Sequence, residues 1–182
     1  MAKRDERGER PRSAPKAFAP HDHDLRRSGA MRAAEAVCAA RGAQLTAIRR
    51  RVLELLLESH KPLGAYALLE RLREERGAAQ PPTIYRALDF LVEHGLAHKV
   101  MRLNAFTACS HPGERHMPQF LICSECERIS EITDPAVMRA LGAAAEAAGF
   151  EAHEAAMELL GRCPACREAA EEADAAAETT RR

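Results

Sequence analysis

Six candidate metal ligands stand out between positions 98 and 131 of the 182-residue chain, and two more cysteines follow. They are His98, Cys109, His116, Cys123, Cys126 and Glu131, followed by Cys163 and Cys166. Zinc in proteins usually takes four donors from thiolates, imidazoles and carboxylates. The stretch therefore holds more ligands than one zinc ion needs, and the spacing predicts two zinc sites in each chain.

The two Cys-x-x-Cys pairs, Cys123 with Cys126 and Cys163 with Cys166, predict a closed structural zinc site. Two thiolates reach one ion from each tight turn, and two such pairs complete a tetrahedron. A redox dithiol or a disulfide is the alternative. A thioredoxin-like motif would need a βαβ unit around a single pair, and a reducing compartment disfavours disulfides. Zinc would also stabilise the fold of a chain that has only 4% aromatic residues.

The remaining donors, His98, Cys109, His116 and Glu131, are scattered, so their spacing is a weaker sign of a second site. Two imidazoles, one thiolate and one carboxylate bind zinc less tightly than four thiolates, which suits an ion that is exchanged. His111 is an alternative to His116 as a ligand. Because the donors come from a predicted hairpin and from a later strand, an ion here would fix the angle between two parts of the chain.

Four helices and a hairpin are expected before most of these ligands. Apolar residues at intervals of three and four, with capping and stop residues, predict helices over residues 28–42, 46–59, 66–76 and 81–95. Alternating residues predict a hairpin of strands 97–102 and 106–109. Helices followed by a hairpin are typical of a winged helix-turn-helix domain, whose recognition helix enters the major groove of DNA.

The last of these helices carries candidate DNA contacts. Its buried stripe is expected to be Ile84, Leu88, Leu91 and Val92. The outward side chains of its first two turns are expected to be Thr83, Tyr85, Arg86 and Asp89. An ordinary solvated helix face is the alternative. The surrounding helices, the hairpin and a net charge of +4 over residues 31–104 favour DNA instead.

The second half of the chain predicts a small domain of strands and helix. Strands are expected over 119–123 and 128–133, a helix over 134–149, and a further strand over 150–161 that leads to Cys163. The expected organisation is a disordered arm at 1–27, a winged-helix domain at 28–110, a metal-binding domain at 111–168 and a flexible tail at 169–182. The predicted fold class is therefore α+β.

Charge and composition narrow the classes of function. The net charge is zero, but residues 1–30 carry +3 and residues 105–182 carry −7, so only the front of the chain is expected to meet a polyanion. The chain has no apolar run of the roughly 20 residues that cross a bilayer, and no apolar segment typical of a signal peptide. A cytoplasmic protein without a membrane partner is expected. No catalytic triad, phosphate-binding glycine loop or carboxylate pair indicates an enzyme or a small organic substrate.

With these residues identified, the chain resembles the ferric uptake regulator family over residues 30–168, and most closely its zinc uptake regulator branch. The matching stretches are Leu45-Thr46-x-x-Arg49, Pro82-Thr83-Ile84-Tyr85-Arg86-Ala87-Leu88, His98-Lys99-Val100, Phe120-x-Ile122-Cys123-x-x-Cys126 and Gly161-x-Cys163-x-x-Cys166. The resemblance implies an N-terminal winged helix-turn-helix domain, a C-terminal α/β dimerisation domain and the four-cysteine zinc. It also implies that His98, Cys109, His116 and Glu131 bind a regulatory zinc, and that Tyr85 and Arg86 lie on the recognition helix.

One departure from the family pattern helps to choose the branch. Iron and peroxide sensors of this family carry a His-His-x-His-x-x-Cys run before the first cysteine pair, whereas this chain has only His116 in that segment. Those ligand sets also lack a sensory thiolate, and the thiol of Cys109 favours zinc over iron or manganese. A third metal site is not expected.

The expected function is a zinc-responsive repressor of zinc-uptake genes that binds a palindromic operator in double-stranded DNA as a metal-loaded homodimer. Thr83, Tyr85 and Arg86, with Arg49 and Arg50, are the candidate contacts to bases and phosphates. An iron- or manganese-sensing member of the family is the main alternative. A Cys-x-x-Cys redox protein and a zinc-ribbon adapter that binds only protein are the others.

Overall fold

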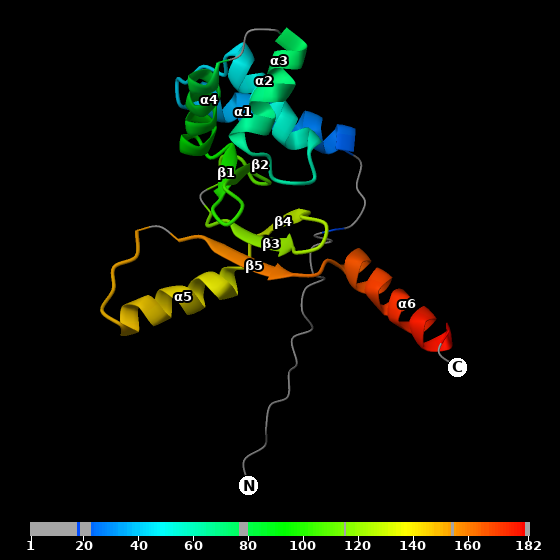
Figure 1. Cartoon of the computed structure of the whole chain (residues 1–182). Coiled ribbons are helices and arrows are strands. Elements are labelled where there is room, and N and C mark those ends of the chain that lie inside the picture. Colours follow the sequence, from blue (N-terminus) through cyan, green and yellow to red (C-terminus); the bar gives the residue numbers. More distant parts are fainter. Residues whose placement is uncertain (1–17, 19–22, 77–79, 115, 154, 181–182) are drawn as a thin grey trace.

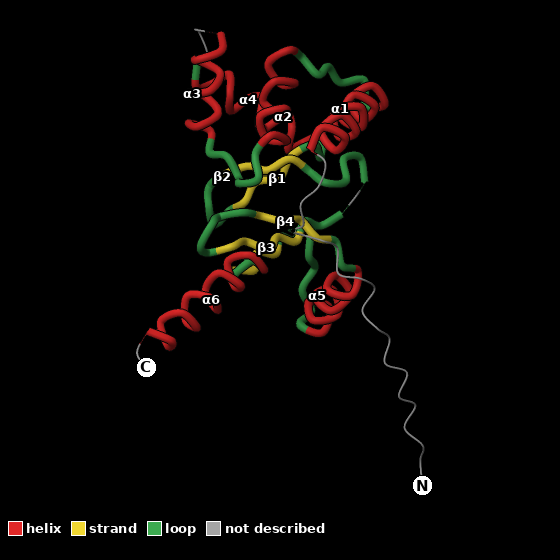
Figure 2. Tube along the Cα trace, turned by 90° about the vertical axis from the view of Figure 1, so that its right-hand side faces the viewer, coloured by secondary structure: helices red, strands yellow, loops and turns green. Residues whose placement is uncertain are grey.

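The computed structural model describes residues 18, 23–76, 80–114, 116–153 and 155–180. The helices are α1 (His23–Ala40), α2 (Ala47–Glu58), α3 (Ala65–Arg76), α4 (Pro81–Glu93), α5 (Pro135–Ala147) and α6 (Pro164–Thr180). The strands are β1 (Ala97–Val100), β2 (Ala105–Ala108), β3 (Gln119–Cys123), β4 (Ile129–Ile132) and β5 (Met157–Gly161). Both views place the β1–β2 hairpin between the helices α1 to α4 and the sheet of β3, β4 and β5 (Figure 1, Figure 2). Among the described residues, no helix is both long enough and apolar enough to span a membrane.

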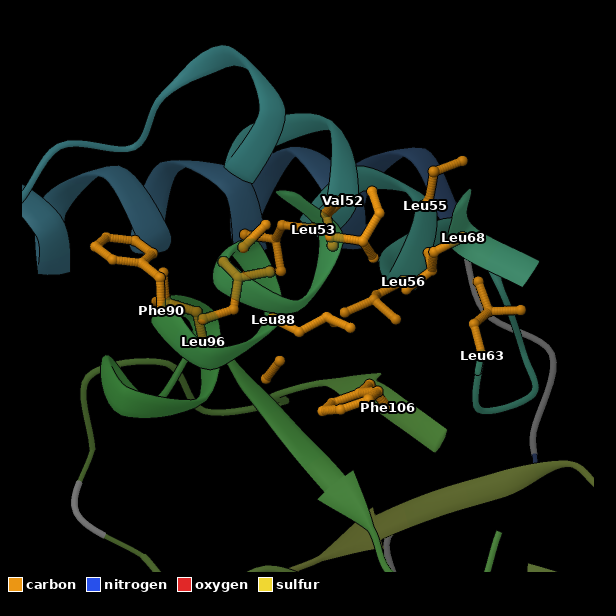
Figure 3. Packing of buried hydrophobic residues seen from close by; sticks show 14 of the residues in the cluster. Val52, Leu53, Leu55, Leu56, Leu63, Leu68, Leu88, Phe90, Leu96 and Phe106 are labelled. Atoms are coloured by element: carbon orange, nitrogen blue, oxygen red, sulfur yellow. The ribbon is translucent and has the colours of Figure 1, made fainter. Parts of the chain in front are cut away.

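The first four helices bury one apolar core, as their apolar residues at intervals of three and four predict. The helices expected over 46–59, 66–76 and 81–95 are present as α2, α3 and α4. Figure 3 shows side chains from the helices and the hairpin, among them Leu56, Leu88 and Phe106, that meet in this core. Helix α1 begins at His23, before the predicted start at Ser28. The predicted arm at 1–27 otherwise lies outside the described residues, apart from position 18.

Helix α4 differs from the prediction on one side of its buried stripe. Three of the four predicted residues are buried, but Val92 is 39% exposed. Because α4 packs against both α2 and α3, Ala87 and Phe90 are turned into the core in place of Val92. Gly95, with a φ of 66°, follows the helix in the left-handed conformation that glycine adopts easily. Thr83, Tyr85, Arg86 and Asp89 of the first turns are exposed, as predicted.

The hairpin follows α4 directly and gives the predicted winged helix-turn-helix. Strands β1 and β2 are antiparallel, and Asn104 takes the left-handed conformation in their turn, with a φ of 44°. Leu63, in the loop between α2 and α3, exchanges two backbone hydrogen bonds with Phe106 of β2, each of 2.9 Å. The hairpin is therefore attached to the helices, so that hairpin and helices form one domain.

The C-terminal sheet has the strand order β4-β3-β5, with β3 antiparallel to β4 and parallel to β5. Helix α5 lies in the connection from β4 to β5. Asp134 caps α5 by accepting a hydrogen bond of 2.8 Å from the N–H of Ala136, which confirms the predicted helix start. None of the residues of α5 is buried. The segment predicted as a tail at 169–182 is helical in α6 as far as Thr180.

A smaller apolar cluster joins the hairpin to this sheet. Val100 of β1 is fully buried and packs with Phe120, Ile122 and Ile129 of the sheet. The N–H of Ile129 also donates to the carbonyl oxygen of His60, in the helical domain, over 3.3 Å. The two domains are thus in direct contact through both apolar packing and backbone hydrogen bonding.

Candidate metal centres

The sheet topology brings the two Cys-x-x-Cys pairs together at one edge. Strands β3 and β5 are parallel neighbours with Cys123 opposite Gly161, so both strands end at the same edge. Cys126 lies in the turn after β3, and Cys163 and Cys166 lie where β5 passes into α6. The four sulfur atoms lie within 4.8 Å of one another. All six cysteines of the chain are free thiols.

These four thiols fit a tetrahedral zinc ion. Zn–S bonds of about 2.3 Å place the sulfurs of a tetrahedron about 3.8 Å apart, and the Sγ atoms of Cys126 and Cys163 are 3.8 Å apart. Burial raises the pKa of Cys123, but the N–H groups of Cys126, Cys163 and Glu125, with the thiol of Cys126, outweigh it and lower that pKa to about 6. Hydrogen bonds with Cys163 and Cys126 raise the pKa of Cys166 to about 12, so the first thiolate of the group forms at Cys123. The turn therefore stabilises a thiolate, the form of cysteine that binds zinc.

The second set of donors converges where the hairpin meets the sheet. His98 belongs to β1, Cys109 follows β2, His116 lies in the loop before β3, and Glu131 belongs to β4. Oε1 of Glu131 is 2.8 Å from Nε2 of His116 and 3.2 Å from Nε2 of His98. Sγ of Cys109 is 3.5 Å from Nε2 of His116. The structure brings all four predicted residues together, with every ligand atom within 4.8 Å of the others.

The electrostatics of this second set fit a divalent cation. Nε2 of His98 is buried and makes no hydrogen bond within the described residues. Burial raises the pKa of Glu131, but His98, the N–H of Ser110 and His116 outweigh it and lower that pKa to about 2. Burial, and after it the charge of Glu131, raises the pKa of Cys109 to about 12. A zinc ion would take up the lone pair of His98 and favour the thiolate of Cys109, so the donor set suits it.

The two histidines of the loop before β3 have different surroundings. Nδ1 of His116 lies 2.9 Å from the carbonyl oxygen of Glu114. Because a carbonyl only accepts, this contact puts the proton on Nδ1 and leaves the lone pair of Nε2 facing the other donors. His111, the alternative ligand, is not one of the four converging residues. Its backbone N–H donates to Sγ of Cys109 over 3.3 Å, and its ring lies edge-on to that of His116.

The outward face of α4 presents the predicted contacts of the recognition helix. Thr83, Tyr85 and Arg86 are exposed, and Tyr85 lines a hollow with Tyr66 and Lys99 between α3, α4 and the hairpin. Tyr66 is 71% exposed, and sequence reasoning missed it. A single aromatic residue on the polar side of a helix has no local pattern that distinguishes it, and only the folded arrangement places it beside Tyr85.

Arg49 and Arg50, the other predicted DNA contacts, both have partners within the protein. The guanidinium of Arg49 lies over the ring of Phe90, 3.6 Å from its centroid, and donates to the carbonyl oxygen of Gln44 over 2.7 Å. Arg50 forms an ion pair of 2.6 Å with Glu35. These contacts connect α2 to α4 and to α1. The two arginines therefore hold helices together, and their contact with DNA stays a prediction.

The chain is similar to known zinc and ferric uptake regulators over most of its length. Residues 40–160 match the Ferric uptake regulator family. The zinc uptake regulation protein of Escherichia coli (strain K12) is 38% identical over 136 residues, which cover 74% of this chain and 80% of that protein. The structure of holo XcZur is 43% identical with a TM-score of 0.72, over 78% of this chain and 99% of that one. A zinc uptake regulator complexed with zinc and DNA is 35% identical with a TM-score of 0.76, over 80% and 97%.

Proposed function

The chain belongs to the ferric uptake regulator family, and we propose that it is a zinc-responsive repressor that binds DNA as a homodimer. One observation carries this proposal. His98 and Cys109 of the hairpin meet His116 and Glu131 beside the sheet, so that one ion would take ligands from both domains. The similarity to a zinc uptake regulation protein supports zinc-uptake genes as the targets and the cytoplasm as the location.

The residues around the second site explain how a bound ion would fix the direction of the recognition helix α4. A bound zinc ion would supply two positive charges and four bonds to the protein at this point. Glu131 and His116 form the sheet side, and Glu131 also accepts a hydrogen bond of 2.8 Å from the N–H of Ser110, just after β2. His98 and Cys109 form the hairpin side. Because the hairpin follows α4 directly, fixing the hairpin against the sheet also fixes the direction of α4.

The four-cysteine site is proposed to hold a second, structural zinc in each chain. Its cysteines come from the ends of two neighbouring strands and from the start of α6, so an ion there would hold these three segments together. An all-thiolate set binds zinc more tightly than a mixed set. The two sites would therefore differ in role, one permanent and one responsive to the concentration of zinc.

Strand β5 and helix α5 provide the surface for the homodimer. β5 is an edge strand of the sheet, and the exposed apolar side chains of this domain include Leu159, Leu160, Phe150 and Met138. An unpaired strand edge with exposed apolar groups beside it is the kind of surface that a second copy covers. A symmetric dimer would direct two α4 helices, with Tyr85 exposed on each, at the two half-sites of a palindrome.

Binding to a duplex from the gene's own promoter region, while free Zn²⁺, Fe²⁺ and Mn²⁺ are varied, tests this proposal. We expect the affinity for DNA to rise as zinc fills the second site, because the thiol of Cys109 favours zinc over the other two metals. A response to Fe²⁺ or Mn²⁺ alone would instead support an iron- or manganese-sensing function within the family. DNA binding that ignores all three metals would contradict the proposal.

A further inference from the structure

A row of three side chains crosses the face of the C-terminal sheet that is turned to the hairpin. Phe120 of β3 is paired with Glu131 of β4 on one side and with Glu158 of β5 on the other. Residues paired across neighbouring strands point to the same face. Phe120 packs with Val100 of the hairpin, which identifies that face. A carboxylate therefore stands on each side of Phe120, and only that of Glu131 belongs to a candidate metal site.

The carboxylate of Glu158 accepts two hydrogen bonds from the backbone of the hairpin turn. Its Oε1 accepts from the N–H of Met101 over 2.6 Å, and its Oε2 accepts from the N–H of Arg102 over 3.1 Å. Two successive N–H groups that face one carboxylate form an anion-binding arrangement, and hydrogen bonds to a charged group are stronger than neutral ones. Glu158 thus joins the two domains without any metal.

Glu131 makes the matching contact at the other end of the hairpin. Its Oε2 accepts from the N–H of Ser110, which follows β2, over 2.8 Å. The two carboxylates of the row therefore attach the hairpin to the sheet at two places, one beside the second metal site and one at the turn. Together with the apolar cluster around Val100, these two contacts hold both ends of the hairpin against the sheet and so fix its direction and that of α4.

We propose that Glu158 is a positioning residue for DNA binding. Glu158 holds the hairpin turn against the sheet. With the turn held, an ion that fixes the other end of the hairpin at the second site also fixes the direction of α4. This inference rests on the proposed function, and it gives Glu158 no contact with metal or DNA. Because zinc and DNA both favour the same arrangement of the domains, loss of the Glu158 contact should weaken both of them through that shared equilibrium.

The test compares the full-length, zinc-loaded protein with its E158Q and E171Q variants. Glu171 is an exposed carboxylate of α6 that pairs with Arg167 of the same helix, so E171Q makes the same chemical change away from the hairpin. Amide hydrogen exchange at residues 101–102 is expected to be about tenfold faster in E158Q and unchanged in E171Q.

The affinities for DNA and for zinc are measured on the same variants. At saturating zinc, the dissociation constant of E158Q for promoter DNA is expected to rise about tenfold, the size of one charge-assisted hydrogen bond. The salt dependence of DNA binding should not change, since Glu158 touches no phosphate. Chelator competition should show weaker zinc binding at the second site, while zinc at the four cysteines is retained.

The outcomes separate the contact, its role and the proposed function. Unchanged exchange in E158Q would overturn the contact. Faster exchange with wild-type affinities for DNA and second-site zinc would overturn the positioning role. If the wild type shows no zinc-dependent DNA binding, the proposed function is wrong. The comparison of second-site zinc affinity between wild type and E158Q still tests the role of Glu158.

If E158Q does not fold, the wild-type protein alone provides the test. Filling the second site should then slow exchange at residues 101–102, and unaltered exchange would overturn the inference.

Discussion

Nε2 of His98, on the hairpin, lies 3.2 Å from Oε1 of Glu131, on the C-terminal sheet. The two side chains belong to different domains, and both are largely buried, with 14% and 3% of their surface exposed. The imidazole nitrogen has no hydrogen bond within the described residues. A carboxylate and a buried imidazole that face one another in this way favour a cation between them. In the proposed function, an ion bound at this point would set the direction of α4 relative to the sheet.

Replacing Glu131 by glutamine is expected to weaken zinc at the second site by at least about tenfold, because a neutral amide oxygen is a poorer ligand than a carboxylate. The four-cysteine site should keep its metal, since Glu131 is not part of it. Competition with a chromophoric chelator measures both affinities, and E171Q serves as the control for charge. Wild-type affinity in E131Q would contradict the assignment of Glu131 as a ligand.

Replacing Cys123 by serine is expected to remove the structural zinc and to unfold the C-terminal domain. Binding of structural zinc contributes on the order of 10 kcal/mol to small domains of this kind, which is comparable to the whole stability of a domain. Metal analysis and size-exclusion chromatography measure the result. Cys38→Ser is the matched control, because Cys38 is buried in the helical core away from both candidate sites. A C123S variant that remains a dimer and keeps both zinc ions per chain would contradict the four-cysteine site.

Replacing Arg86 by alanine is expected to abolish tight binding to promoter DNA while both zinc ions are retained. Arg86 is exposed on the first turns of α4, where a guanidinium reaches bases or phosphates. If it contacts a phosphate, the slope of log affinity against log salt should become smaller by about one. Arg167→Ala, an exposed arginine of α6, is the control. DNA binding unaffected by R86A would place the recognition surface elsewhere.

Replacing Arg49 by alanine is expected to lower the free energy of unfolding by about 1 kcal/mol, because the stacking on Phe90 and the hydrogen bond to Gln44 are both lost. Urea denaturation of the zinc-loaded protein measures this change. The effect on DNA affinity should be smaller than that of R86A. Unchanged stability together with a reduced salt slope would instead assign Arg49 mainly to DNA.

The elements whose signals are local could be predicted from the sequence. Helix α4 has proline at its start and Gly95 after its end, and the four-cysteine site consists of two pairs with a fixed spacing. The side chains at the edge of the buried stripe of α4 were harder to predict. Whether Val92 or Phe90 is buried depends on where α2 packs, and Phe90 is fixed by the guanidinium of Arg49 above its ring. No periodicity within one helix contains that information.

Contacts between distant segments could not be predicted in the same way. The donors of the second site come from separate segments, so spacing alone left His111 as an alternative, and the choice of His116 depended on a resemblance to the family. Glu158 has no spaced partner in the sequence, and its hydrogen bonds go to backbone N–H groups of Met101 and Arg102. Because every residue except proline offers such a group, the side chains of the turn carry no sign of the contact.

DNA binding by Cys109→Ala, followed as a function of free zinc, tests the second site most directly. Cys109 takes part in that site and not in the four-cysteine site. We expect the variant to remain a dimer with about one zinc per chain in place of about two, and to bind promoter DNA weakly at every concentration of zinc. The wild type should bind more tightly as zinc rises. A variant that keeps both zinc ions and the wild-type response would contradict control of DNA binding by a metal between the domains.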